Sequence, residues 1–220
     1  MKAKWCDLFV LGLVQCSNQF CLTSMLAAMS SHLNACSRVG QLKVERFEEV
    51  DEQIRYLLKL VQKFDDLKLS SMEFAYLKLI SFTANDLPGA SPDQRIHALH
   101  MQAMQELYDH ILSVGGVTGF EDNTSENDSS SAAAVAASMY GTLDRYSQLL
   151  MLLPTLRWFK QSILVELFFS GLIGNLSIET VMPFILAMDV MNVFDNSDGS
   201  ESTALPGAQS LANILCKNEE

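Results

Sequence analysis

The chain has 220 residues, of which 49% are hydrophobic, so it is long enough for one well-packed core and short for two. Its formal net charge of −11 excludes general binding to nucleic-acid phosphates, which needs clustered Lys and Arg, and favours proteins or apolar small molecules as partners. The five cysteines include no C-x-x-C pair, which argues against a zinc module or a disulfide framework and favours reduced thiols in the cytosol or nucleus.

The amino terminus has some features of a signal peptide. Lys2 and Lys4 precede an apolar run, Leu8–Val14. However, Asp7 directly precedes that run, and Gln15 is not the small residue that cleavage prefers. No stretch approaches the roughly 18–20 apolar residues that a membrane-spanning helix needs. We therefore expect a soluble chain.

Two long helical segments come first. Residues 4–36 are apolar with helical periodicity, and breaks are expected at Gly12 and at Ser17–Asn18. From Glu45 to Phe64, apolar residues recur at spacings of three and four, which predicts an amphipathic helix. Its Ile54-x-x-Leu57-Leu58 motif imitates a receptor-box peptide, but on such a helix it is expected to lie in the core.

Capping signals predict the next two helices. Ser70 is a candidate N-cap with Glu73 in the first turn of a helix that runs through Ile80. The segment Asn85–Gly89 ends that helix, because its proline lacks a donor and its glycine accepts positive φ. Ser91-Pro92-Asp93 then starts another helix, which extends to about residue 114.

Two segments differ in composition from the rest. Residues 115–140 are rich in Gly, Ser, Ala and acids, with too little apolar surface to offset ordering, and are expected to form a disordered insertion. The polar segment 191–220 is expected to be a flexible tail. Residues 1–190, apart from the insertion, are then the folded domain.

Four motifs near the carboxyl end occur in a fixed order. They are Leu153-Pro154-Thr155-Leu156-Arg157, Glu166-Leu167-Phe168-Phe169, Leu172-Ile173-Gly174 and Ile178-Glu179-Thr180. This order resembles the end of a nuclear receptor ligand-binding domain, most closely the testicular-receptor group of orphan receptors and next the retinoid X receptors.

Earlier segments extend the resemblance over most of residues 4–190. Trp5–Phe9 resembles the opening of the family's central helix, and Glu73–Lys78 followed by Asp86–Gly89 resembles its eighth helix and the loop after it. The resemblance implies an all-α, layered helical fold that lacks the family's first helices. The third of these supplies a pocket wall and the basic half of the coactivator clamp. An apolar face near Leu8–Leu26 would then be open to water, and the isolated chain would behave as a molten globule.

The last predicted helix resembles the family's activation helix. Its apolar pairs are Val181 with Met182 and Ile185 with Leu186, and the resemblance implies that they dock coactivator or corepressor peptides. Activating receptors place an acid between the pairs, where it caps the coactivator helix. Here Phe184 occupies that position, which predicts a weak activator or a repressor. An ordinary core-packing helix is the alternative.

A ligand site also follows from the resemblance. Its expected residues are Cys6, Phe9, Val10, Leu13, Cys16, Ile163, Glu166 and Leu167. Relatives that bind a carboxylate ligand place an arginine where Cys16 stands, so an acidic ligand would lose its charge-assisted partner. A plain core without ligand remains an equal alternative.

A dimer interface is predicted on the helix expected over residues 142–168. Leu149–Leu153 is apolar on every side, so more than one side must be covered. The resemblance implies that another receptor covers one of these sides, at Leu149, Leu153, Leu156 and Arg157. A purely internal role is the alternative.

No catalytic motif or paired nucleophile and base occurs in the chain, so an enzyme is not expected. His97 and His100 with Asp93 provide too few ligands for a metal site. We expect no cofactor and no direct contact with nucleic acid or membrane. The predicted function is transcription regulation in the nucleus through dimerisation and coregulator docking, with an apolar ligand as a candidate regulator. A cytosolic helical carrier or interaction protein for an apolar molecule is the alternative.

Overall fold

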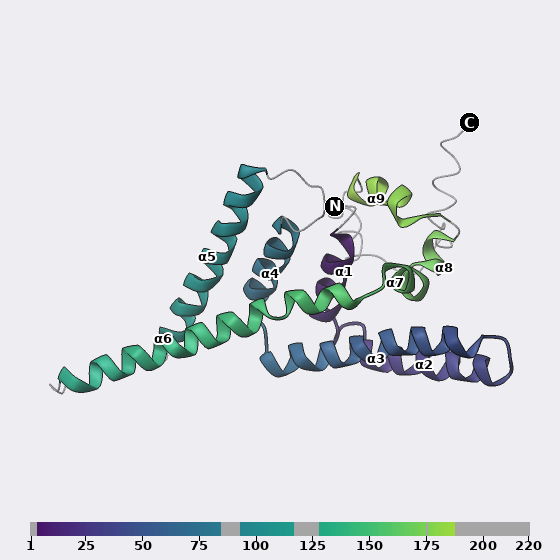
Figure 1. The fold of residues 1–220 in the computed structure, drawn as a ribbon, viewed down its shortest axis with the longest axis horizontal. Coiled ribbons are helices and arrows are strands. Elements are labelled where there is room, and N and C mark those ends of the chain that lie inside the picture. Colours follow the sequence, from purple (N-terminus) through teal and green to yellow (C-terminus); the bar gives the residue numbers. More distant parts are fainter. Residues whose placement is uncertain (1–3, 85–92, 117–127, 175, 188–220) are drawn as a thin grey trace, which may run out of the picture. The chain divides into compact units, whose positions relative to one another are not determined.

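The computed structural model describes residues 4–84, 93–116, 128–174 and 176–187, which contain helices and turns and no strand (Figure 1). This confirms the all-α expectation. The described residues up to Phe159 form one compact unit, and the described residues from Lys160 onward form a second. No helix in the described ranges is both long enough and apolar enough to cross a membrane.

The first two helices are separated by a tight turn. Helix α1 spans Trp5–Gln15 and α2 spans Leu22–Arg38. The break falls at the predicted Ser17–Asn18 cluster, where the amide of Leu22 donates to the carbonyl of Ser17 at 2.9 Å and Cys21 adopts a φ of 48°. Gly12 does not interrupt α1, so the break expected at this glycine is absent.

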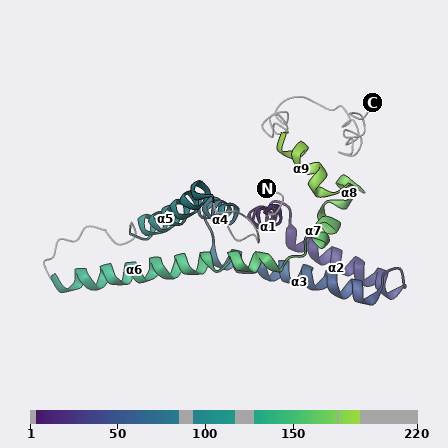
Figure 2. The same cartoon turned by 45° about the horizontal axis from the view of Figure 1, so that its top comes forward.

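Helix α3 spans Val44–Leu67 and packs against α2 as an antiparallel hairpin (Figures 1 and 2). The predicted amphipathic spacing is confirmed, because Val50, Ile54, Leu57, Val61 and Phe64 are all buried. The Ile54-x-x-Leu57-Leu58 motif therefore lies in the core, as expected.

Helices α4, Ser71–Thr83, and α5, Gln94–Gly116, pack against each other. Ser70 caps α4 in a full capping box with Glu73, as predicted. The Asp93 carboxylate accepts from the amide of Arg95 at 2.8 Å and so supports the start of α5. The expected breaker segment 85–89 and Pro92 lie outside the described residues.

Helix α6 spans Asp128–Leu150 and packs against α5. Its first half belongs to the segment that was expected to be disordered, so residues 128–140 differ from that expectation. The alanine-rich run in this segment favours a helix intrinsically, despite the low apolar content of the segment. Residues 117–127 lie outside the described ranges.

Residues 142–168, which were predicted to form one helix, are divided among three elements. After α6 comes a 3-10 helix, η2, over Leu153–Trp158, and then α7 over Gln161–Phe168. Pro154 lacks an amide donor and favours the first turn of a helix, so it starts η2 rather than continuing α6. Phe159 and Lys160 are extended and separate η2 from α7.

The second unit contains α7, the short α8, Ser170–Ile173, and α9, Ile178–Ala187. Gly174 has a φ of +59°, a conformation that glycine adopts without strain, and it ends α8. The hydroxyl of Ser177 accepts from the amide of Thr180 at 3.3 Å at the start of α9. The expected tail 191–220 lies outside the described residues.

Candidate functional sites

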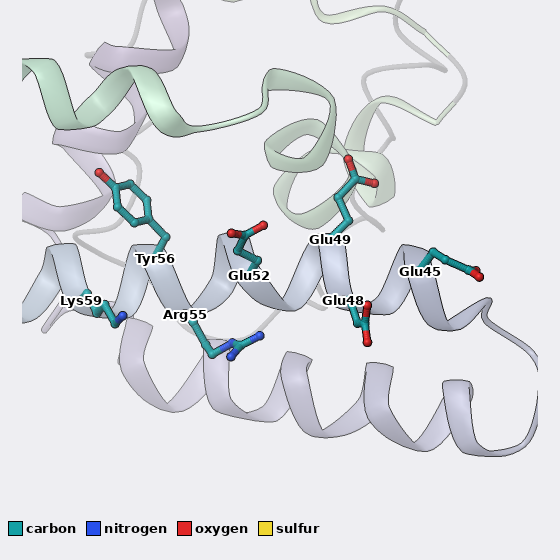
Figure 3. A pocket seen from close by; sticks show the side chains of 7 residues that line it. All are labelled: Glu45, Glu48, Glu49, Glu52, Arg55, Tyr56 and Lys59. Atoms are coloured by element: carbon teal, nitrogen blue, oxygen red, sulfur yellow. The ribbon is translucent and has the colours of Figure 1, made fainter.

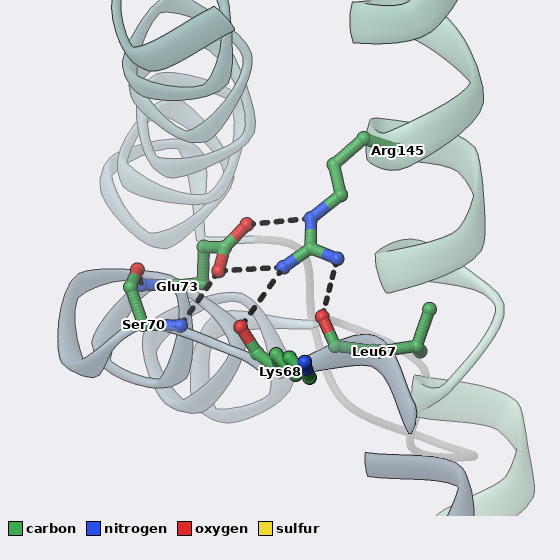
Figure 4. Close-up of polar contacts among 5 residues, drawn as sticks. All are labelled: Leu67, Lys68, Ser70, Glu73 and Arg145. Carbon is green, nitrogen blue, oxygen red and sulfur yellow. Dashed lines mark hydrogen bonds and ion pairs between the residues drawn. The ribbon is translucent and has the colours of Figure 1, made fainter. Parts of the chain in front are cut away.

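An ion pair between Glu73 and Arg145 joins α4 to α6 (Figure 4). Arg145 Nε and Nη2 each donate to one carboxylate oxygen at 2.9 Å, and Nη1 donates to the carbonyl of Leu67. The amide of Ser70 donates to the same carboxylate at 2.7 Å. Burial alone would raise the pKa of Glu73, but the hydrogen bonds from Arg145 and Ser70 outweigh it and hold this pKa below its ordinary value.

A second polar cluster holds α1 against α4 and η2. Asp7 is buried on α1, and its carboxylate accepts from the hydroxyl of Ser81 at 3.2 Å. Arg157 Nε lies 3.7 Å from the same carboxylate. Burial, and then the positive charge of Arg157, lowers the pKa of the neighbouring Lys4. These contacts fix where α1 sits in the first unit.

Side chains from α3 hold η2 in place. The hydroxyl of Tyr56 donates to the carbonyl of Thr155 at 2.8 Å, and Gln53 Nε2 donates to the carbonyl of Trp158 at 3.3 Å. The rings of Tyr56 and Phe159 pack with centroids 5.1 Å apart. Carbonyls that a regular α-helix would use internally therefore find partners on α3.

The predicted dimer residues divide between the core and the surface. Leu149 and Leu156 are buried within the chain, so these two cannot supply the interface surface expected from the sequence. Leu153 is half-buried and Arg157 is exposed. The apolar surface of this segment comes instead from Met151, 66% exposed, and Trp158, 72% exposed.

Helix α9 carries the predicted coregulator residues. Val181 is buried, Met182 is half-buried and Phe184 is exposed, while the side chains of Ile185 and Leu186 lie outside the described residues. Pro183 stands inside the helix and cannot donate to the carbonyl one turn back. Glu179, at the first turn, accepts from Gln161 of α7 at 3.3 Å.

Comparisons with known proteins identify the domain. Residues 1–173 match the family model described as the ligand-binding domain of nuclear hormone receptor. The chain is 33% identical over 204 residues to orphan steroid hormone receptor 2 of Strongylocentrotus purpuratus, covering 93% of this chain and 30% of that protein. It is 32% identical to human nuclear receptor subfamily 2 group C member 2, covering 86% of this chain and 28% of that protein.

The chain belongs to the nuclear hormone receptor family. The resemblance recognised in the sequence is thereby confirmed, including its orphan-receptor character. The Xenopus laevis protein named nuclear receptor subfamily 2 group C member 1-A is also similar, at 31% identity over 86% of this chain and 26% of its own length. This chain thus spans about a third or less of the curated relatives it matches.

In this receptor domain, the expected ligand residues of the first unit lie along α1 and at Cys16, the residue directly after it. Cys6, Phe9, Leu13 and Cys16 are half-buried and follow one another at helical spacing, and Val10 is buried. Burial, and then the adjacent Asp7 carboxylate, raises the pKa of Cys6 to about 12, so its thiol stays protonated. A neutral thiol behaves as a small apolar group, which suits contact with an apolar molecule.

The remaining expected ligand residues lie on α7 in the second unit. Ile163 is buried, Leu167 is half-buried and Glu166 is exposed. Because Glu166 is exposed on α7, its carboxylate avoids the full desolvation penalty of a buried acid.

The receptor domain also has an open polar groove along α3, with a volume of about 660 Å3 (Figure 3). Its lining residues are Glu45, Glu48, Glu49, Glu52, Arg55, Tyr56 and Lys59. None of the expected ligand residues lines this groove, and its carboxylates make it a poor site for an apolar molecule. In the ranges that the structure describes, no group of three or more His, Cys, Asp or Glu side chains could hold a metal ion.

Proposed function

We propose that this nuclear receptor domain regulates transcription in the nucleus by associating with another receptor and by docking coregulator peptides. Family membership supports a regulatory rather than a catalytic role. It also favours this function over that of an independent carrier, and an apolar molecule remains the proposed regulator. Cys16, where carboxylate-binding relatives have an arginine, favours a ligand without a carboxylate.

The exposed apolar side chains of α6 and the segment after it carry the proposal. Tyr140 and Leu143 of α6 and Met151, which directly follows that helix, are each more than half exposed. Tyr140 and Leu143 are three residues apart and therefore lie on the same side of α6. Trp158 adds a fourth large exposed side chain on η2. Aromatic and methionine side chains of this kind are enriched at protein interfaces. The buried leucines of the same segment hold it against the first unit and leave these side chains for a partner.

The test replaces the exposed residues rather than the buried ones. Met151→Glu with Trp158→Glu should abolish association with a retinoid-X-type ligand-binding domain, because docking would bury two unpaired charges. Val39→Glu is the matched control. Val39, which directly follows α2, is 69% exposed, close to the 66% of Met151 and the 72% of Trp158. Sedimentation velocity of the mixed proteins measures association, and circular dichroism checks folding.

Two outcomes would reject the proposed interface. Association of the double variant with unchanged affinity would show that Met151 and Trp158 do not face the partner. If Val39→Glu weakens association equally, the added charge is responsible and not the positions of Met151 and Trp158. Leu149→Glu is unsuitable for this purpose, because it would place a charge in the core of the monomer.

A further inference from the structure

One exposed lysine belongs to a short sequence pattern that the receptor function proposed above does not use. Residues 42–45 are Leu42-Lys43-Val44-Glu45, in which a branched apolar residue precedes a lysine and a glutamate stands two residues after it. The conjugating enzyme of the small ubiquitin-like modifier SUMO recognises this four-residue pattern directly. The branched side chain packs beside the reactive cysteine of that enzyme and the glutamate pairs with basic residues, so the lysine reaches the cysteine. A pattern this short has meaning only in a structural context that fits it.

We propose that Lys43 is an acceptor site for a small ubiquitin-like modifier. The neutral amine of Lys43 attacks the thioester carbonyl that joins the last residue of the modifier to the cysteine of the conjugating enzyme. An isopeptide bond forms, the carbon–sulfur bond breaks and the cysteine leaves as a thiolate. The ammonium form of Lys43 loses one proton to solvent before the attack, and the proton released when the amide forms returns to the thiolate.

The position of Lys43 makes it accessible to another protein. It lies between α2 and α3, at the tip of the hairpin that these two helices form (Figures 1 and 2). Lys43 and Glu45 are exposed, and Val44 is 57% exposed. Among the described residues, no hydrogen bond or ion pair holds the Lys43 ammonium group. Leu42 is half-buried, so part of its side chain is also accessible.

The backbone at this site suits recognition of an extended segment. Lys43 has a φ of −65° and a ψ of 141°, which is an extended conformation. Val44 and Glu45 belong to the first turn of α3, so that turn must open when the segment binds. Lys43 is the N-cap of α3 and makes no side-chain capping hydrogen bond, whereas Ser70 caps α4 with its hydroxyl. The first turn of α3 therefore lacks the stabilisation of a cap and opens at low cost.

Acidic side chains continue from the four-residue pattern along one side of α3. Glu45, Glu48 and Glu52 are all exposed and follow one another at spacings of three and four residues (Figure 3). A basic surface next to the catalytic cleft of the conjugating enzyme would meet these carboxylates while Lys43 is at the cysteine. The acidic side of α3 thus favours the same partner as the four-residue pattern does.

Other lysines of the chain contain only part of the pattern and serve as controls. Lys59 is exposed on α3 and follows a leucine, but no acid stands two residues after it. Lys63 is also exposed on α3 and has Asp65 two residues after it, but it follows a glutamine. Lys217 has a glutamate two residues after it, but it follows a cysteine.

Conjugation of the 220-residue chain with purified activating enzyme, conjugating enzyme, SUMO and ATP tests the proposal. The wild type should gain one modifier, and mass spectrometry of its peptides should place the isopeptide bond at Lys43. Lys43→Arg should abolish the conjugate while circular dichroism shows an unchanged fold. Glu45→Gln keeps the lysine and should lower the initial rate at least about tenfold, because a charged hydrogen-bonding group is lost.

The control variants Lys59→Arg, Lys63→Arg and Lys217→Arg should be conjugated at the wild-type rate. Glu48→Gln with Glu52→Gln should lower the rate, and this loss should shrink as the salt concentration rises. If the rate of this double variant is unchanged, the acidic side of α3 does not contact the enzyme, and that part of the proposal is wrong.

Three outcomes would overturn the assignment of Lys43. The first is a conjugate that persists at the wild-type level in Lys43→Arg, and the second is an unchanged rate in Glu45→Gln. The third is the absence of a conjugate on the wild-type chain in a mixture that modifies a free peptide of residues 40–53. That result would show that the folded chain does not present the segment to the enzyme.

Discussion

The Glu73 carboxylate both caps the start of its own helix, α4, and joins that helix to α6. Its hydrogen bond from Ser70 is local and was visible in the sequence as a capping box. Its partner Arg145 lies 72 residues further along the chain. The residues around Glu73 in the sequence do not predict that contact. A carboxylate this buried is stable as an anion only because the guanidinium and the Ser70 amide both donate to it.

The lowered pKa of Glu73 makes the stability of the domain depend on pH. Because the pKa in the folded state lies below that in the unfolded state, the pair stabilises the fold above the unfolded value of about 4.3. That stabilisation is lost as the pH falls through the folded pKa. Glu73→Gln should therefore lower the free energy of unfolding by roughly 2 kcal/mol at neutral pH, and the difference from wild type should shrink below about pH 4.

Urea denaturation at several pH values measures this effect. Glu48→Gln is the control, because Glu48 is exposed on α3 and a surface carboxylate contributes little. A difference between Glu73→Gln and wild type that is constant with pH would show that Glu73 is not the group whose ionisation stabilises the fold.

At the scale of elements, the interrupted helix around η2 is the most informative feature. Pro154 gives a local reason for an interruption, but the chain resumes only at Gln161 in α7. The intervening turn depends on α3, whose Tyr56 and Gln53 donate to the carbonyls of Thr155 and Trp158. The conformation of η2 therefore depends both on Pro154 and on hydrogen bonds from α3, a helix distant in the sequence.

Removing the Tyr56 hydroxyl tests this support. Tyr56→Phe should keep the ring contact with Phe159 but lose the hydrogen bond to Thr155, at a cost of about 1 kcal/mol in the free energy of unfolding. Tyr140→Phe is the matched control, because Tyr140 is largely exposed on α6. Denaturant midpoints compare the two variants, and faster hydrogen exchange at the Phe159 amide should accompany Tyr56→Phe alone.

The elements whose signals are local were predicted well. The α3 periodicity, the Ser70 cap and the break near Ser17 each depend on neighbouring residues, and each is found in the structure. Residues 128–140 belong to α6, and their alanine-rich composition favours a helix despite its low apolar content. The burial of Leu149 and Leu156 depends on which side of the segment faces the first unit, and an all-apolar run cannot reveal that side.

At the scale of the whole molecule, each unit carries a different part of the proposed receptor function. The first unit presents the α6 and η2 surface, and the second contains α9 with the residues proposed to dock coregulators. In α9, Val181 is buried and Phe184 is exposed, so the residue predicted to stand where activating receptors have an acid faces solvent. A phenylalanine there cannot accept from the first amides of a bound coactivator helix.

Phe184→Glu should therefore strengthen binding of a Leu-x-x-Leu-Leu coactivator peptide. The clamp needs its basic half as well, so the measurement uses a chimaera in which the upstream part of the human relative's ligand-binding domain precedes residue 1. A hydrogen bond to a charged group is worth about 1.5–3 kcal/mol, which corresponds to roughly tenfold to hundredfold in Kd. Fluorescence anisotropy with a labelled peptide gives the affinities of both chimaeras.

Leu172→Glu separates the clamp from the effect of added charge. Leu172 of α8 and Phe184 of α9 are both 45% exposed, so the two substitutions add the same charge at equally exposed positions of the second unit. If only Phe184→Glu tightens binding, a carboxylate at that one position caps the peptide. If Leu172→Glu tightens peptide binding equally, the gain comes from the added negative charge and not from its position. If the unaltered chimaera already binds as tightly as Phe184→Glu, another acid, such as Glu179 in the first turn of α9, caps the peptide instead.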